Sequence, residues 1–309
     1  MRIVFMGTPD FAVPCLEKLI NSRHDVVAVF SQPDKPVGRK QILTAPPVKV
    51  CALENGIPVY QPNTLKDVEK LELIKSFGAD VIIVVAYGKI LPHEVLVAAK
   101  HGCINVHASL LPKYRGAAPI QWAVLNGDSK TGVTIMQMDD GLDTGDILSV
   151  CETDIGINET SEMLFDRLAE LGGDELLKTL DLVESGEISP QKQPEGDFGY
   201  AAKITKAMSP IDFAKSAFEV HNHIRGLQSW PCASTVINGK NVKIHKSVLC
   251  DIEGGTAGEV IESKKRLIVS CGDGKTIEIL ELQLEGKKRM DAKSFLAGFT
   301  IPEGTVLGR

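Results

Sequence analysis

Residues 80–86 constrain the fold of this chain more than any other stretch. They read Asp-Val-Ile-Ile-Val-Val-Ala, an almost unbroken run of β-branched side chains. A strand that is apolar on both faces is typical of the centre of a parallel sheet, because helices cover both sides of such a sheet. Further apolar strands are predicted at 2–6, 25–31 and 103–107, and helical patterns lie between them, at 11–20, 48–55, 68–77 and 93–99. Alternating strands and helices predict a doubly wound α/β sheet with a ligand crevice at the carboxyl ends of its strands.

The turn after the first strand begins at Gly7 and reads Gly-Thr-Pro-Asp-Phe, with Asp10 as a candidate cap of the next helix. Nucleotide-binding sheets begin in this way. The dinucleotide fingerprint, however, requires Gly-x-Gly-x-x-Gly, and only its first glycine is present. We therefore interpret the turn as part of a Rossmann-like parallel sheet and not as a nicotinamide or flavin site.

The carboxyl-terminal third has a different texture. Residues 186–206 are polar and rich in Gln, Pro and Gly, which is typical of a linker. A helix is predicted at 211–225, and short alternating strands follow with hairpin signals at Asn238-Gly239 and Asp273-Gly274. This pattern predicts a small antiparallel, OB-like β-barrel. We expect a first domain at 1–188, a linker at 189–206 and the barrel domain at 207–309.

Charge and cysteine content indicate the compartment of the protein and argue against some kinds of site. The net charge is -6, but from residue 207 onward 14 Lys+Arg face 12 Asp+Glu, so the excess of acid lies in the first two thirds. Seven cysteines without a Cys-x-x-Cys pair argue against a disulfide framework and a zinc site. The chain contains neither a signal-peptide pattern nor an apolar run of membrane-spanning length. We expect a cytoplasmic protein without a membrane segment.

The loop at residues 32–47 is long and rich in proline. Connections in such folds usually take about two to six residues, so this loop needs a reason of its own. It carries Lys35, Arg39 and Lys40. One interpretation is a solvated surface loop; the other is a flexible basic arm that meets a polyanion.

The polar residues with the clearest chemistry lie in and after the strand at 103–107. Side chains alternate along a strand, so Asn105 and His107 face the same way, ~7 Å apart. A second apolar run at 131–138 is followed by Asp-Asp-Gly-Leu-Asp-Thr-Gly-Asp, which places Asp143 in a turn with glycines after the end of a strand. Because we expect the carboxyl ends of these strands to share one crevice, Asp143 should reach His107.

This set of residues suits direct attack of an external nucleophile on a carbonyl. No Gly-x-Ser-x-Gly elbow is present, so a covalent acyl intermediate is not expected. Asn105 and His107 could stabilise the oxyanion, and Asp143 could orient the imidazole or handle its proton. The alternative is structural: the histidine could be hydrogen-bonded filler and Asn105 could tie down a loop. The acids at 139–146 lack the spacing of a calcium loop, and no metal is expected.

Longer motifs carry a resemblance to a known family. The segment at 104–121, Ile-Asn-Val-His-Ala-Ser-Leu-Leu-Pro-Lys-Tyr-Arg-Gly-Ala-Ala-Pro-Ile-Gln, resembles the folate-dependent formyltransferases, as do Thr-Gly-Val-Thr-Ile-Met-Gln-Met-Asp at 131–139 and Gly-Leu-Asp-Thr-Gly-Asp at 141–146. The Gln-Pro-Asp-Lys-Pro loop at 32–36 and Val-Val-Ala-Tyr-Gly at 84–88 narrow the likeness to the branch that acts on methionyl-tRNA. The resemblance extends over essentially the whole chain.

The resemblance implies transfer of a formyl group from 10-formyltetrahydrofolate to the α-amine of initiator methionyl-tRNA, without a metal and without an obligate protein partner. The implied site residues are a catalytic triad, a folate-contacting segment and a tRNA-contacting loop: Asn105, His107 and Asp143; Ser109, Leu110, Leu111 and Pro112; Arg39 and Lys40. On the barrel, we expect phosphate contacts from Lys243, Lys246, Lys287, Lys288 and Arg289. Two other readings remain: a formyltransferase that acts on an amino sugar nucleotide, and a tRNA-binding module without chemistry.

Overall fold

The structure is a computed structural model that describes residues 1–38 and 40–308. The chain divides into two compact units, each built from separate segments. The first contains Met1–Gly116, Thr131–Thr153 and Phe165–Tyr200. The second contains Ala117–Lys130, Asp154–Leu164 and the chain from Ala201 onward. Because the units interleave along the sequence, the domain limits expected at 188 and 207 stay a prediction.

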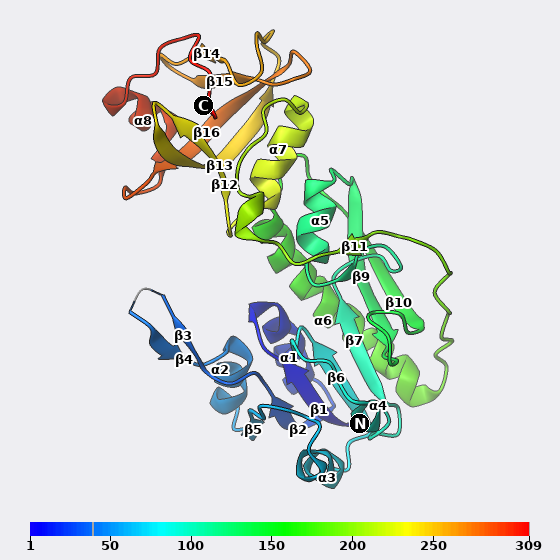
Figure 1. The fold of residues 1–309 in the computed structure, drawn as a ribbon. Helices are drawn as coiled ribbons and strands as arrows, with labels where there is room; N and C mark the ends of the chain where they lie inside the picture. Colours follow the sequence, from blue (N-terminus) through cyan, green and yellow to red (C-terminus); the bar gives the residue numbers. More distant parts are fainter. Residues whose placement is uncertain (39, 309) are drawn as a thin grey trace. The chain divides into compact units, whose positions relative to one another are not determined.

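The first unit is organised around a mixed sheet. Its described strands follow the order β10-β9-β7-β6-β1-β2-β5 (Figure 1). Strands β6, β1, β2, β5 and β7 run parallel to their neighbours within that set, whereas β9 pairs with β7 antiparallel. The predicted Rossmann-like α/β class is thereby confirmed. The strand bounds are β1 Arg2–Gly7, β2 Asp25–Phe30, β5 Val59–Tyr60, β6 Val81–Val85, β7 Cys103–His107, β9 Lys130–Gln137 and β10 Ile147–Asp154.

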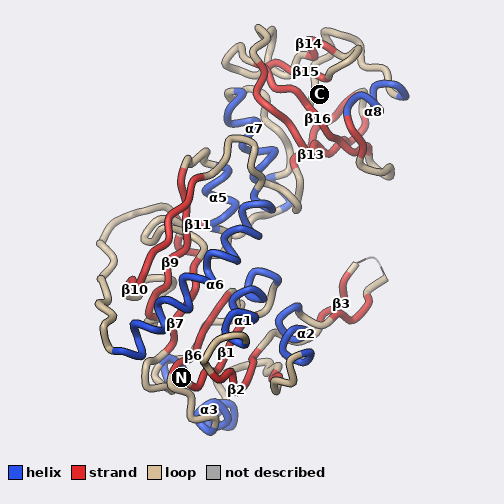
Figure 2. Tube along the Cα trace, turned by 180° about the vertical axis from the view of Figure 1, so that it is seen from behind, coloured by secondary structure: helices blue, strands red, loops and turns tan. Residues whose placement is uncertain are grey.

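Helices cover both faces of this sheet. The helices that cover it include α1 Val13–Ile20, α2 Pro47–Glu54, α3 Val68–Ser76, α4 His93–Leu96 and α6 Ser161–Ser185. Figure 2 shows α6 running across the sheet beside β7. In α6, a Cβ added at Gly172 would lie 2.9 Å from Val106 of β7 and 3.9 Å from Cys15 of α1. Glycine there lets α6 approach the sheet closely. Val106 therefore points toward α6, so its neighbours in β7 point to the opposite face.

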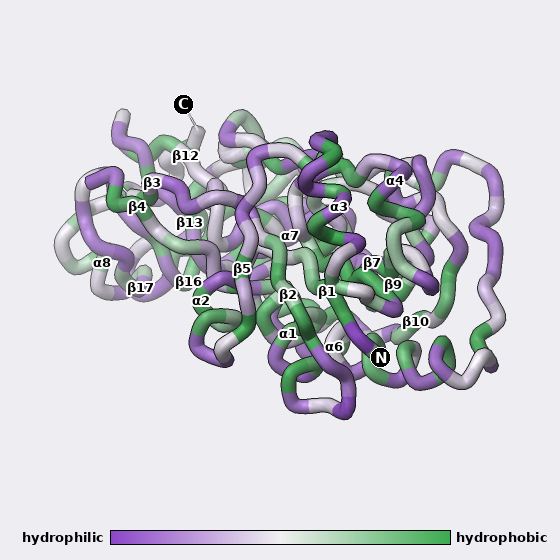
Figure 3. The backbone as a smooth tube through the Cα atoms, turned by 90° about the horizontal axis from the view of Figure 1, so that it is seen from below, coloured by the Kyte–Doolittle hydropathy of each residue, from purple (hydrophilic) through white to green (hydrophobic). Residues whose placement is uncertain are grey.

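The opposite face carries its own apolar cluster. Val4, Ile82 and Cys103 pack there with side chains of α3 and α4 such as Ile74 and Val95. All five residues of β6 are buried, as the sequence predicted. Figure 3 colours β1 and β2 chiefly as hydrophobic, in keeping with strands covered on both sides. Among the described residues, no helix is both long and apolar enough to cross a membrane.

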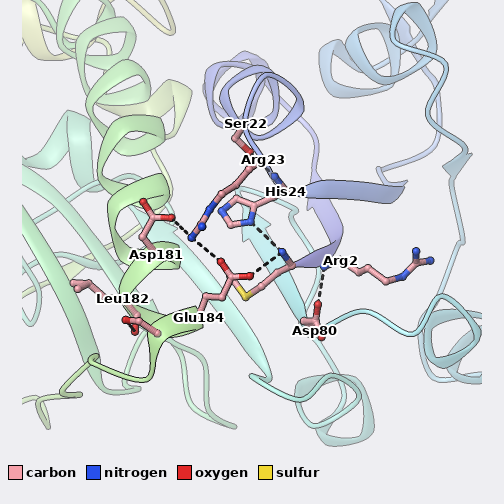
Figure 4. A network of polar contacts seen from close by, with 10 residues as sticks. Arg2, Ser22, Arg23, His24, Asp80, Asp181, Leu182 and Glu184 are labelled. Atoms are coloured by element: carbon pink, nitrogen blue, oxygen red, sulfur yellow. Dashed lines mark hydrogen bonds and ion pairs between the residues drawn. The ribbon is translucent and has the colours of Figure 1, made fainter.

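Charged residues link the start of the sheet to the end of α6. Arg23 contacts Asp181 and Glu184, each at 2.7 Å, and the backbone amide of Arg2 donates to Asp80 Oδ2 at 2.7 Å (Figure 4). The Arg23 side chain is 65% exposed. Exposed ion pairs each contribute about 0–1 kcal/mol, so this network adds little to the stability that the apolar clusters supply.

Two expected helix caps are wrong. Asp10 lies inside a 3₁₀ turn, η1 Asp10–Ala12, and caps no helix, because α1 begins only at Val13 and its first residues have no side-chain cap. The amphipathic pattern at 159–184 predicts a long helix with Asn158 as its cap, but α6 begins at Ser161. The hydroxyl of Thr160 accepts a hydrogen bond from the Met163 amide at 3.2 Å, which is the contact of an N-cap residue.

The long proline-rich loop is partly ordered as a hairpin. Within it, β3 Lys35–Val37 pairs antiparallel with β4 Ile42–Thr44. Lys40 lies exposed in the turn, whereas Arg39 lies outside the described residues. At the base of the hairpin, Lys49 Nζ binds Asp34 Oδ1 at 2.8 Å, and this ion pair lowers the pKa of Asp34. The hairpin therefore projects from an anchored base.

The second unit contains the predicted antiparallel sheet. Its described strands follow the order β12-β13-β16-β15-β14, and β17 pairs with β16. The last residues join the two edges of the sheet: Leu307 N donates to Gly258 O at 2.8 Å, and Gly308 N donates to Val236 O at 3.0 Å. These bonds close the sheet into a barrel. The strand bounds are β12 Ala233–Ile237, β13 Lys240–Cys250, β14 Val260–Glu262, β15 Leu267–Ser270, β16 Thr276–Leu284 and β17 Met290–Asp291.

Helices accompany the barrel, and one is shorter than expected. The helices of this unit are α5 Pro119–Leu125, α7 Ala217–Gly226 and α8 Ala292–Gly298. The sequence predicted a helix from 211, but α7 begins at Ala217. Ser216 and Glu219 form a capping box, each side chain accepting from the other residue's backbone amide. That cap fixes the beginning of the helix and leaves 211–216 outside it.

Candidate active site

The candidate site lies on the face of β7 that α6 does not cover. Near the beginning of this strand, the Cys103 thiol lies 3.5 Å from the Val95 carbonyl of α4. Asn105 and His107 follow on the same face and are 9% and 6% exposed. Alternation along the strand therefore places the two polar side chains side by side, as the sequence predicted.

His107 is held through one ring nitrogen. Its Nε2 lies 3.0 Å from the carbonyl oxygen of Tyr114, and a carbonyl only accepts, so Nε2 carries a proton. Its Nδ1 lies 3.7 Å from Asp143 Oδ2, beyond hydrogen-bond distance. The ring is thus fixed in orientation, and Nδ1 faces the Asp143 carboxylate 3.7 Å away.

Asp143 lies close to His107, but not for the reason expected from the sequence. We expected both residues at the carboxyl ends of parallel strands. In fact β9 runs antiparallel to β7, and its last residue, Gln137, pairs with Ile104 near the beginning of β7. The turn at 138–146 has to run back along β7 to bring Asp143 to His107. The contact therefore depends on the shape of this turn and not on a shared sheet edge.

Several local contacts shape that turn. Asp143 has a φ of +52°, in the left-handed region that Asp tolerates better than most residues. A Cβ at Gly145 would lie 1.8 Å from the Gln137 carbonyl oxygen, so only glycine fits there. Asp143 Oδ2 accepts a hydrogen bond from the Gly116 amide at 2.9 Å. The carboxylate is therefore fixed by the short strand β8 Arg115–Gly116, and its side chain is 16% exposed.

The side chain of Asn105 is available to a ligand. Among the described residues, its amide makes no hydrogen bond within the protein, although the residue is buried. The Oδ1 and Nδ2 atoms of Asn105 are not among the side-chain atoms that are shut off from solvent, so water or a ligand can reach them and supply the hydrogen bonds. This observation favours a binding role for Asn105 over the alternative in which it ties down a neighbouring loop.

The segment at 109–112 forms a packed loop beside His107. The Ser109 hydroxyl donates to the Lys113 carbonyl at 2.6 Å, so it is already engaged inside the loop. Thr134 Oγ1 donates to the Ser109 carbonyl at 2.7 Å and accepts from the Leu111 amide at 3.1 Å. Leu111 is buried, and Leu110 and Pro112 are half-buried. These contacts hold an apolar wall next to the histidine.

The side chains present do not form a recognisable metal centre. Among the described residues, no group of three or more His, Cys, Asp or Glu side chains could hold a metal ion. All seven cysteines carry free thiols, and burial raises the pKa of Cys103 to about 12. That thiol is therefore a packing group.

The structure also adds residues that the sequence did not single out. The Tyr114 carbonyl and the Gly116 amide hold His107 and Asp143 through the backbone, and the Gln193 side chain binds the turn that carries Asp143. Backbone groups leave no mark in a sequence. Gln193 lies in a segment that its composition assigned to a linker, so no sequence signal pointed to it.

Comparison with known proteins defines the family. The model named Formyl transferase matches residues 1–180, and the model named Formyl transferase, C-terminal domain, matches residues 203–300. The chain therefore belongs to the formyl transferase family.

Individual relatives narrow the match. A methionyl-tRNA formyltransferase from Alkaliphilus oremlandii (strain OhILAs) is 48% identical over 309 residues, and one from Clostridioides difficile (strain 630) is 47% identical over 310 residues; each match covers 100% of both chains. Among solved structures, an N-formyltransferase from Helicobacter canadensis in complex with folinic acid and dTDP-3-aminofucose has a TM-score of 0.69 at 24% identity. That match covers 90% of this chain and 98% of the other. At this identity the likeness supports the fold alone.

Proposed function

We propose that this protein transfers the formyl group of 10-formyltetrahydrofolate to the α-amine of methionine on initiator tRNA. The observation that carries the proposal is the site on β7, where an unpartnered amide, an oriented imidazole and a carboxylate come together in a formyl transferase fold. The relatives named above at 47–48% identity support the choice of methionyl-tRNA as acceptor. Charged tRNA is a cytoplasmic substrate, so the proposal also places the enzyme in the cytoplasm, with no further protein subunit.

In the proposed reaction, the uncharged amine attacks the formyl carbon. The Asn105 amide donates to the oxyanion that forms, and His107 adds a second donor when Nδ1 is protonated. The bond from the formyl carbon to N10 of the folate then breaks, and the proton lost by the amine ends on N10. Nδ1 of His107 and the carboxylate of Asp143, 3.7 Å apart, are the groups placed to move that proton.

The folate is proposed to lie against the loop at 109–112. A flat pterin suits an apolar wall with a few polar backbone groups, and Leu110, Leu111 and Pro112 supply such a wall beside His107. The Ser109 hydroxyl is engaged by the Lys113 carbonyl, so its proposed contribution is to shape the loop. Leu110 is half-buried and is the residue on which a substitution can test this wall.

The tRNA is proposed to meet two separate basic features. The β3–β4 hairpin presents Lys40 and also contains Arg39, which lies outside the described residues. On the barrel, Lys243, Lys246, Lys287 and Lys288 are exposed, whereas Arg289 already pairs with Glu281 at 2.6 Å. Phosphate contacts from such lysines add affinity without reading sequence. We further propose 1–188 as the catalytic domain, 189–206 as the linker and 207–309 as the tRNA-binding domain.

Product analysis tests the proposal. The protein is incubated with 10-formyltetrahydrofolate and initiator methionyl-tRNA, and the methionine released from the tRNA is analysed for N-formylmethionine. A parallel reaction offers an amino sugar nucleotide. Formylation of the sugar with no formylation of methionyl-tRNA would replace this proposal with the sugar-specific alternative, and tRNA binding without either product would support the non-enzymatic one.

A further inference from the structure

The strand-like segment after α6 is fastened to the sheet next to the candidate site. Gln191 and Ile147, the first residue of β10, exchange two backbone hydrogen bonds of 2.8 Å each. Ile147 directly follows the turn that carries Asp143. This pairing holds residue 193 beside that turn, although the composition of the segment predicts a linker.

Gln193 uses its whole side-chain amide at this place. Its Nε2 donates to the carbonyl oxygens of Asp143 at 2.9 Å and Gly145 at 2.8 Å. Its Oε1 accepts from Arg115 Nε at 3.0 Å and Nη2 at 2.7 Å. Guanidinium groups only donate and carbonyls only accept, so the chemistry of the partners fixes which end of the amide is oxygen.

The two segments that Gln193 binds are those that meet at the Asp143 carboxylate. One contains Asp143 itself, and the other contains Arg115, whose neighbour Gly116 donates to Asp143 Oδ2 at 2.9 Å. The Gln193 side chain thus binds both the segment whose amide donates to the Asp143 carboxylate and the turn that carries this carboxylate. The left-handed backbone of Asp143 is intrinsically unfavourable, so the turn depends on contacts such as those of Gln193 to keep its shape.

We propose that Gln193 is a positioning residue that keeps the Asp143 carboxylate in register with His107. This inference rests on the proposed function, since it assigns Gln193 to the same reaction through Asp143. Gln193 contacts the carbonyls of the turn and not the reacting atoms. A displacement of about 1 Å in a catalytic group can cost about a hundredfold in rate, so loss of these bonds should lower kcat by about ten- to hundredfold. The KM for methionyl-tRNA should change less than about threefold.

Three variants separate positioning from general stability. Gln193→Ala removes all four bonds. Gln193→Glu keeps an oxygen for Arg115 but removes both donors to the turn, so we expect it to lose as much kcat as Gln193→Ala. Gln191→Ala is the matched control, because that side chain is exposed and its backbone bonds to Ile147 survive; it should keep wild-type kcat. Thermal melting of each variant verifies that the protein is folded.

A double-mutant cycle gives the decisive readout. Single-turnover rates are measured for the wild type, Gln193→Glu, Asp143→Ala and the double variant. If Gln193 acts through Asp143, the Gln193 substitution costs nothing further once the carboxylate is gone. Full additivity in the cycle, or wild-type kcat in Gln193→Glu, overturns the inference. An inactive wild type or an undiminished Asp143→Ala would instead refute the proposed function or the role of Asp143, so the two failures are distinguishable.

Discussion

Two buried histidines of this protein show how similar surroundings serve different purposes. His107 in the first unit and His221 in the second are 6% and 1% exposed. Each donates from Nε2 to a backbone carbonyl, to Tyr114 at 3.0 Å and to Ile157 at 2.9 Å. They differ at Nδ1. In His221 this nitrogen lies 2.9 Å from the Ser247 hydroxyl, whereas in His107 it lies 3.7 Å from the Asp143 carboxylate.

The difference extends to the neighbours of each ring. Close to His221 along α7, the buried Arg225 donates from Nε to Asn222 Oδ1 at 2.8 Å and from Nη1 to the carbonyls of Gly156 and Glu159 at 3.1 and 2.8 Å. Next to His107, the Asn105 amide has no such partner among the described residues. In the second cluster Asn222 Nδ2 is also buried without a partner, so unused capacity alone does not mark a ligand site. The Asn105 amide differs because its atoms are not shut off from solvent, so a ligand can reach them. Burial alone does not tell the two apart.

The largest expected effect is on catalysis at the first cluster. His107→Asn should lower the single-turnover rate of formyl transfer by about 10²–10³, the usual cost of one oxyanion donor, and Asp143→Ala should lower it similarly. Binding of tRNA should survive, whereas the melting temperature should fall modestly, because the variants lose the Nε2 bond of His107 to Tyr114 or the bond from the Gly116 amide to Asp143. His101→Asn is the matched control, since the His101 side chain is half-buried and makes no hydrogen bond within the described residues. A decrease below about fivefold in both site variants would remove these residues from the mechanism.

The next effect is on stability at the second cluster. Arg225→Met should lower the free energy of unfolding by about 2–4 kcal/mol, because a buried hydrogen bond to Asn222 and two partly buried ones to the carbonyls of Gly156 and Glu159 are lost. Denaturant titration measures this change. Arg266→Met is the control in the same unit: that side chain is 43% exposed and pairs with Glu278, so its loss should cost at most about 1 kcal/mol. Equal losses in the two variants would contradict the contrast between the clusters.

Features of the structure that have a local cause could be predicted from the sequence, and features that depend on distant residues could not. The shared face of Asn105 and His107 follows from strand alternation, which any strand imposes, so the prediction of their placement needed no knowledge of the fold. The beginning of α7 also has a local cause, since Ser216-Ala-Phe-Glu219 has the spacing of a capping box. The closure of the barrel by residues 307 and 308 does not, because it joins strands far apart in the chain.

Long-range pairing explains what the sequence could not supply at the candidate site. The direction of β9 is decided by its pairing with β7, and a strand's residues do not record the direction of its neighbour. Asp143 was therefore assigned correctly to the neighbourhood of His107 by an incorrect argument. Gln193 was missed because a single amide in a polar segment carries no pattern, and its role depends on where the turn at 143–145 lies.

The smallest expected effect is a pH dependence that belongs to the second cluster. Burial lowers the pKa of His221 below its ordinary value, and Arg225 lowers it further against the opposing hydrogen bond to Ile157. The unfolded chain therefore binds a proton more readily than the folded one, so stability rises with pH through this window and is lost as pH falls from about 6.5. Burial is also the main cause that lowers the pKa values of His223 and His245, so each of these histidines contributes to the rise of stability with pH.

The unfolding free energies of the wild type and of His221→Gln are measured at pH 7.5 and 5.5. The difference between the two proteins should be larger at pH 7.5, because the variant has no histidine at position 221 to protonate as the pH falls. An equal difference at both pH values would mean that the fold does not hold His221 neutral.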